Sequence, residues 1–197
     1  MRDRELDIVT PDGAMNTFVT HPEEDGPFPV VLLLMDAPGR REELSDMARR
    51  LGAGGYYVML PNLYYRRVRD FAPTPERRSE MIAHMNSLTN AMVCDDARAL
   101  LAHTVQDPEA GSGPAGCVGY CMSGPFAFAL AAAIPQRIAA AASFHGVRLC
   151  TEALDSPHLT AHEVRGELYF GCAETDEWAP AEMVEALDAH LASVGLR

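Results

Sequence analysis

Residues 119–124 read Gly-Tyr-Cys-Met-Ser-Gly, which places a cysteine between small residues where an apolar strand is predicted to end and a helix to begin. This pattern approximates a nucleophile elbow, a sharp strand-to-helix turn that strains the backbone at one residue and exposes its side chain. The turn requires small neighbours, a condition that Gly119 meets fully and Ser123 approximately. The start of the following helix favours a thiolate and stabilises charge on a substrate oxygen. Cys121 is therefore a candidate nucleophile, although most free cysteines are simply small buried residues.

Other interpretations of this segment fail on spacing. Its glycines do not form the G-x-G-x-x-G pattern of a dinucleotide-binding turn, and no Gly-Lys-Ser/Thr sequence follows as a phosphate loop requires. Ser123 is a poor nucleophile candidate, because the positions that must be small would then hold Cys121 and Pro125. The segment therefore indicates cysteine chemistry rather than phosphate binding.

The sequence around the elbow predicts alternating strands and helices. Continuous apolar runs, typical of strands buried on both faces of a parallel sheet, occupy residues 30–35, 56–60, 115–119, 139–144 and 167–171. Helical spacing of apolar residues occupies residues 42–51, 76–88 and 92–103, and further helices are predicted at residues 124–133 and 180–194. Residues 5–10 and 15–20 alternate around a Pro-Asp-Gly turn and predict an antiparallel hairpin, and the Gly/Pro/Ser-rich residues 107–114 predict a connection. We therefore expect an α/β fold with a mostly parallel central sheet, helices on both faces and an N-terminal hairpin.

Composition narrows the class of protein. The chain has 197 residues, 48% of them hydrophobic, which predicts a single domain over residues 1–197. A formal net charge of -12 argues against nucleic-acid partners and anionic membrane surfaces. The N-terminus lacks the apolar stretch of a signal peptide, no uncharged apolar run approaches the about 20 residues of a membrane span, and the five cysteines are scattered. We expect a cytoplasmic protein with reduced thiols that acts on a small molecule.

Four segments carry a resemblance to a known family. They are residues 61–66 (Pro-Asn-Leu-Tyr-Tyr-Arg), 119–124, 143–146 (Ser-Phe-His-Gly) and 168–176 (Leu-Tyr-Phe-Gly-Cys-Ala-Glu-Thr-Asp). Together they resemble the dienelactone hydrolase family of the α/β-hydrolase superfamily over nearly the whole chain. The resemblance implies hydrolysis of a carboxylic ester or lactone through a Cys-His-Asp triad and a thioester intermediate, with no cofactor.

The same resemblance implies roles for individual residues. Asp176 falls on the family's acidic triad position, although Glu174 and Glu177 are close by and an ordinary loop acid or helix cap is the alternative. Asp36 stands where the family leads us to expect a glutamate that holds the resting thiol, and it is one methylene shorter. The backbone N–H groups of Ala37 and Met122 take the positions of the oxyanion hole.

Substrate contacts are less sharply predicted. The family uses a cation to bind a substrate carboxylate, and Arg40, Arg66 and Arg148 are candidates that the sequence does not separate. His145 is expected near the substrate as a hydrogen-bonding residue rather than as the base. A zinc site from His145, Cys150, His158 and His162 is disfavoured by their irregular spacing.

The resemblance also implies a catalytic histidine in a His-Gly loop after one further strand, and the sequence ends at Arg197 before such a strand. We therefore expect a C-terminal strand and helix, with this histidine, to be missing from residues 1–197. The alternative is a catalytically silent binding or regulatory protein built on the same fold.

Overall fold

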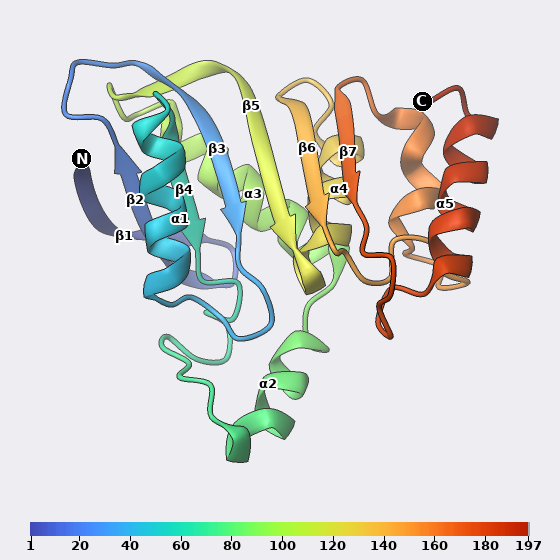
Figure 1. Cartoon of the computed structure of the whole chain (residues 1–197). Coiled ribbons are helices and arrows are strands. Elements are labelled where there is room, and N and C mark those ends of the chain that lie inside the picture. The colour runs from blue at the N-terminus through green and yellow to red at the C-terminus, as the bar shows by residue number, and fades with distance from the viewer. Residues whose placement is uncertain (197) are drawn as a thin grey trace.

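The computed structural model describes residues 1–196, whose strands form one sheet in the order β1-β2-β4-β3-β5-β6-β7 (Figure 1). Strands β3, β4, β5, β6 and β7 run parallel to one another, whereas β1 and β2 are antiparallel to each other and β2 is antiparallel to β4. The strands are β1 (Arg2–Thr10), β2 (Gly13–His21), β3 (Phe28–Leu34), β4 (Tyr57–Pro61), β5 (Ala110–Tyr120), β6 (Ile138–Phe144) and β7 (Glu167–Gly171). The predicted parallel sheet with an N-terminal hairpin is confirmed.

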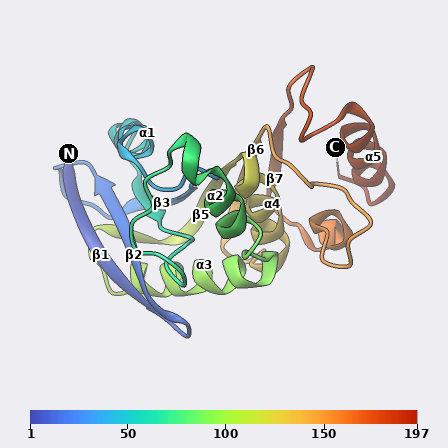
Figure 2. The same ribbon diagram turned by 90° about the horizontal axis from the view of Figure 1, so that it is seen from below.

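Helices cover both faces of the sheet, as predicted. They are α1 (Glu42–Ala53), α2 (Arg78–Met85), α3 (Asn90–Thr104), α4 (Gly124–Ala133) and α5 (Ala181–Ser193). Helix α1 packs on one face, and α3 and α4 pack side by side on the other (Figure 2). Helix α4 is apolar along its whole length because the sheet, α3 and the 3-10 helix Pro157–Glu163 enclose it. Helix α2 lies beyond the carboxyl ends of the parallel strands, where the elbow is also found (Figure 1).

Two predicted boundaries were wrong. Strand β5 begins at Ala110 inside the segment predicted to be a connection, because Ala110 pairs with Phe28 of β3 before a register shift. The helix predicted at residues 76–88 is divided into a 3-10 turn, Pro75–Arg77, and the short helix α2. The next helix, α3, begins separately with Thr89 as its N-cap. The hydroxyl of Thr89 accepts a hydrogen bond from the backbone N–H of Met92 at 3.2 Å.

Strands β5, β6 and β7 are only partly covered on the face of the sheet that carries α1. A groove of about 550 Å³ runs along that face between Tyr56 and Tyr169 and is floored by the alanines of β6. No described helix has the length and apolar character needed to cross a membrane.

Candidate active site

Cys121 occupies a strained turn between β5 and α4. Its φ angle is 52°, in the left-handed region that residues other than glycine seldom adopt. The 3-10 turn Cys121–Ser123 follows at once and leads into α4. The thiol lies at the carboxyl edge of the sheet and is partly exposed. The local geometry of a nucleophile elbow, predicted from residues 119–124, is therefore present.

The residues around the turn explain why it is built from small side chains. A Cβ atom on Gly119 would overlap the backbone carbonyl of Ser123, and one on Gly124 would overlap Gly146. Ser123 has a role of its own, because its buried hydroxyl accepts the backbone N–H of Tyr120 at 3.0 Å and lies 3.2 Å from the carbonyl oxygen of Leu34. This serine therefore joins the elbow to the end of β3.

The environment of Cys121 favours a thiol rather than the expected thiolate. Burial raises the pKa of Cys121, and the carboxylates of Asp36 and Asp176 raise it further. A hydrogen bond from the backbone N–H of Met122 opposes these effects without cancelling them. The net effect is a pKa of Cys121 above its usual range, which favours the thiol at neutral pH.

Asp36 lies close enough to Cys121 to act on its pKa but is bound to a different partner. Its two carboxylate oxygens accept hydrogen bonds from the guanidinium of Arg41, one of them at 2.9 Å. No hydrogen bond joins Asp36 to Cys121 among residues 1–196. Arg41 was not singled out in the sequence, and the only signal for it is a cation five residues after the acid.

Asp176 lies half-buried in the loop after β7. Its Oδ1 atom accepts the backbone N–H of Trp178 at 2.8 Å, so the carboxylate also stabilises its own loop.

His145 follows β6 with a φ of 41°. It donates its backbone N–H to the carbonyl of Gly171 at 2.6 Å and exposes its side chain. Within residues 1–196, no histidine side chain is hydrogen-bonded to Cys121 or to Asp176.

The two backbone N–H groups assigned to the oxyanion hole lie just after two adjacent strands of the sheet. Ala37 follows β3 and Met122 follows β5, and the ends of these strands pair through Leu34 and Gly119. The hydroxyl of Tyr64 lies between the two segments, 2.8 Å from the carbonyl oxygen of Ala37 and 3.2 Å from the sulfur of Met122. Tyr64 belongs to a segment that carries the family resemblance, yet no role was predicted for it.

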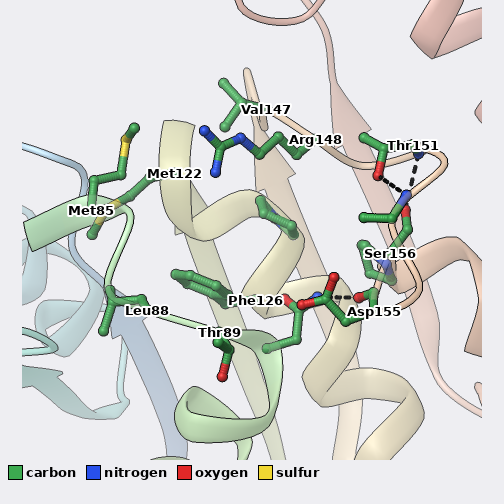
Figure 3. Close-up of a pocket in the computed structure, with 14 residues that line it drawn as sticks. Met85, Leu88, Thr89, Met122, Phe126, Val147, Arg148, Thr151, Asp155 and Ser156 are labelled. Carbon is green, nitrogen blue, oxygen red and sulfur yellow. Dashed lines mark hydrogen bonds between the residues drawn. The ribbon is translucent and has the colours of Figure 1, made fainter. Parts of the chain in front are cut away.

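A cavity of about 160 Å³ lies beside the elbow (Figure 3). Met85 and Leu88 line it from α2 and the segment after it, and Met122 and Phe126 line it from the elbow and α4. Arg148 enters from the loop after β6 with a φ of 56°, and its guanidinium extends toward Met122 and Met85 (Figure 3). Met122 is adjacent to Cys121 in the chain, although Cys121 itself is not among the residues that line the cavity.

Of the three candidate arginines, only Arg148 lines this cavity. The guanidinium of Arg66 is held by both carboxylate oxygens of the buried Asp96 at 2.8 Å. Arg40 forms a two-bond ion pair with Glu5 outside the cavity. The structure therefore does not bring Arg66 or Arg40 to Cys121. The guanidinium of Arg148 has a single neutral partner among the described residues, the Asn86 side-chain oxygen at 3.2 Å.

The histidines considered for a metal site have other partners. His158 is hydrogen-bonded to the hydroxyl of Ser156 at 2.8 Å, and His162 lies 3.3 Å from its neighbour Glu163. Across residues 1–196, no three His, Cys, Asp or Glu side chains are grouped closely enough to hold a metal ion.

The chain is similar in sequence to a family of known proteins. The model of the Dienelactone hydrolase family matches residues 15–196. A Methylorubrum extorquens protein named "Putative carboxymethylenebutenolidase" is 29% identical over 133 residues, which cover 66% of this chain and 45% of that protein. A carboxymethylenebutenolidase of Rhodococcus opacus is 28% identical over 110 residues, covering 56% of this chain and 41% of the relative. The chain thus spans a little under half the length of these two relatives.

The fold also matches solved structures. A "Putative Dienelactone Hydrolase" from Klebsiella pneumoniae superposes with a TM-score of 0.86 at 22% identity, and the match covers 99% of this chain and 82% of that one. A dienelactone hydrolase-like promiscuous phosphotriesterase from metagenomic libraries superposes with a TM-score of 0.81 at 19% identity, covering 99% of this chain and 78% of that one. At these identities the likeness establishes the fold.

Proposed function

The chain belongs to the dienelactone hydrolase family, and from this premise we propose that it hydrolyses carboxylic esters or lactones with Cys121 as the nucleophile. The observation that carries the proposal is the geometry of Cys121, a partly exposed thiol with a φ of 52° at the end of β5. A backbone strained in this way persists only where the surrounding structure holds it, and such residues cluster at active sites.

In the proposed reaction, Cys121 loses its proton and its sulfur attacks the carbonyl carbon of the ester. The carbonyl oxygen becomes an oxyanion that the N–H groups of Ala37 and Met122 stabilise. Collapse of this intermediate breaks the ester C–O bond, and the leaving alkoxide takes up the proton that the thiol released. Water then hydrolyses the thioester to a carboxylic acid and restores the thiol. Asp176 is the carboxylate of the proposed triad, whose partner is a histidine.

The cavity beside the elbow supports a small substrate that carries a negative charge. Its volume of about 160 Å³ limits the group that enters it, and its walls include the apolar side chains of Met85, Leu88, Met122 and Phe126. Arg148 is the only cation and Asp155 the only acid among the residues that line it, and the guanidinium of Arg148 extends toward Met122 (Figure 3). We assign to Arg148 the binding of a substrate carboxylate.

Replacing Arg148 with glutamine is expected to lower kcat/KM about 5- to 10-fold for the 4-nitrophenyl monoester of succinate and to leave the neutral 4-nitrophenyl acetate unaffected, because a partly solvated charge pair contributes about 1 kcal/mol. Arg40→Gln is the matched control, since Arg40 binds Glu5 outside the cavity. Equal losses of kcat/KM for both esters would show that Arg148 does not bind the substrate carboxylate.

The reactivity of Cys121 is expected to follow its raised pKa. Alkylation by iodoacetamide should be slow at pH 7 and accelerate as the pH rises toward the raised pKa, because only the thiolate reacts. Asp36→Asn removes a charge that raises this pKa and frees Arg41, so its rate profile should shift to lower pH. Asp95→Asn, on the surface of α3 beside Arg98, is the control.

The rates are read for each cysteine by peptide mass spectrometry, with and without a small lactone that occupies the site. The proposal expects protection of Cys121 and no protection of the exposed Cys172. A profile for Asp36→Asn that coincides with that of the unaltered protein would show that Asp36 does not control the thiol.

A catalytically silent binding protein on the same fold is the second candidate. One observation favours it: the carboxylate of Asp36 is bound to Arg41 rather than to Cys121. The number of product molecules released for each protein molecule separates the two candidates. A hydrolase turns over many times, whereas a silent relative releases at most one equivalent and remains acylated.

A further inference from the structure

Tyr64 is a fully buried tyrosine whose hydroxyl lies at the junction of the two segments that frame Cys121. Its side chain is 1% exposed. The hydroxyl is 2.8 Å from the carbonyl oxygen of Ala37 and 3.2 Å from the sulfur of Met122. A hydroxyl has one hydrogen, and a carbonyl oxygen is a stronger acceptor than a thioether sulfur. The hydroxyl of Tyr64 therefore donates mainly to the carbonyl oxygen of Ala37, and the sulfur of Met122 packs against it.

The ring of Tyr64 is fixed independently of its hydroxyl. It stacks on the imidazole of His84 at 5.1 Å between centroids and meets the edge of Phe71 at 6.3 Å. Nδ1 of His84 in turn accepts a hydrogen bond from Arg67 at 3.0 Å. These contacts fix the position of the ring, and with it the position of the hydroxyl between the segments that follow β3 and β5.

The acceptor at Ala37 has a particular need for this bond. Its carbonyl belongs to the peptide that joins Ala37 to Pro38, and proline supplies no N–H group for the local hydrogen-bond network. The carbonyl and the N–H group of Ala37 belong to consecutive peptide planes that share one Cα atom. Holding the carbonyl therefore restricts, through the φ and ψ angles of Ala37, the directions open to its N–H group.

We propose that Tyr64 is a positioning residue of the oxyanion hole, whose hydroxyl holds the loop at Ala37 against the elbow at Met122. The inference rests on the proposed function of Cys121 and adds to it the group that sets the spacing of the two N–H donors. Preorganised donors stabilise a developing oxyanion more than they stabilise the substrate, so an error in their position lowers kcat more than it raises KM.

The phenol remains a neutral donor under all working conditions. Burial raises the pKa of Tyr64 well above its usual range, and the neighbouring Asp36 and Cys121 raise it further. A neutral O–H group adds no charge beside the thiol, so the role of Tyr64 is geometric.

The test compares Tyr64→Phe with Tyr65→Phe. Both remove one hydroxyl and keep the ring, but the hydroxyl of Tyr65 binds Thr10 at 2.7 Å and Asp96 at 2.8 Å, outside the site. With 4-nitrophenyl acetate, Tyr64→Phe should lower kcat about 10- to 100-fold with KM unchanged, below the loss caused by deleting an oxyanion donor outright. Tyr65→Phe should retain the kcat of the unaltered protein.

A second measurement needs no turnover. A trifluoromethyl ketone adds reversibly to a cysteine thiol and places an oxyanion in the same hole, so Tyr64→Phe should weaken its binding by the same factor as kcat. Equal kcat and equal ketone affinity in the two variants would overturn the role of Tyr64. If the unaltered protein binds the ketone without turning over ester, weaker binding by Tyr64→Phe still supports the inference while the hydrolase proposal fails. If the unaltered protein does not bind the ketone, both fail.

Discussion

Cys121→Ala is expected to lower kcat/KM for 4-nitrophenyl acetate by at least about 10³-fold, because removal of a nucleophile disables the whole catalytic group. None of the other cysteines is placed to replace it. Cys94 and Cys117 are buried, and burial raises the pKa of Cys94 to about 11. Cys150 is partly exposed and Cys172 is exposed, but they follow β6 and β7 and lie outside the elbow. Loss of activity should therefore depend on Cys121 alone.

Cys172→Ala is the matched control, since it removes a more exposed thiol while leaving the elbow intact. Intact mass after brief exposure to the ester should show one added acetyl group in the unaltered protein and in Cys172→Ala, and none in Cys121→Ala. Full activity in Cys121→Ala would sink the assignment of the nucleophile.

Gly119→Ala is expected to destabilise the protein by about 2–4 kcal/mol and to remove activity, because the new methyl group would overlap backbone atoms that cannot move without opening the turn. The overlap is with the carbonyl of Ser123, whose own side chain joins the elbow to β3. Relief of the clash would displace Cys121 from the oxyanion donors, so activity should fall further than stability alone explains.

Gly116→Ala provides the comparison within the same strand. The nearest atoms to a Cβ at Gly116 lie at 3.8 Å, an ordinary contact distance. Its effect on the free energy of unfolding should stay below about 1 kcal/mol in either direction. Urea unfolding of both variants measures the difference, and equal stabilities would mean that the elbow relaxes more easily than its packing indicates.

The sequence by itself determined the elements and the order in which they alternate. The pattern of apolar and polar residues is a local property, so the alternating hairpin, the apolar parallel strands and the helical spacing of α1 could all be assigned before any contact was known. The small residues at 119 and 124 were likewise readable, because the sharp turn at Cys121 depends on its immediate neighbours. The start of β5 was not, since Ala110 becomes a strand residue only by pairing with Phe28.

Tertiary structure alone decided the partners of the charged and polar side chains. Arg66 is withdrawn from the candidate substrate site by Asp96, which lies thirty residues away in the sequence on α3. Asp36 is occupied by Arg41, and Tyr64 reaches Ala37 and Met122 only because β3, β4 and β5 are neighbours in the sheet. The pKa of Cys121 is raised because burial and two carboxylates outweigh one N–H bond. Such balances depend on the distances between elements, which the residue types and their spacing do not specify.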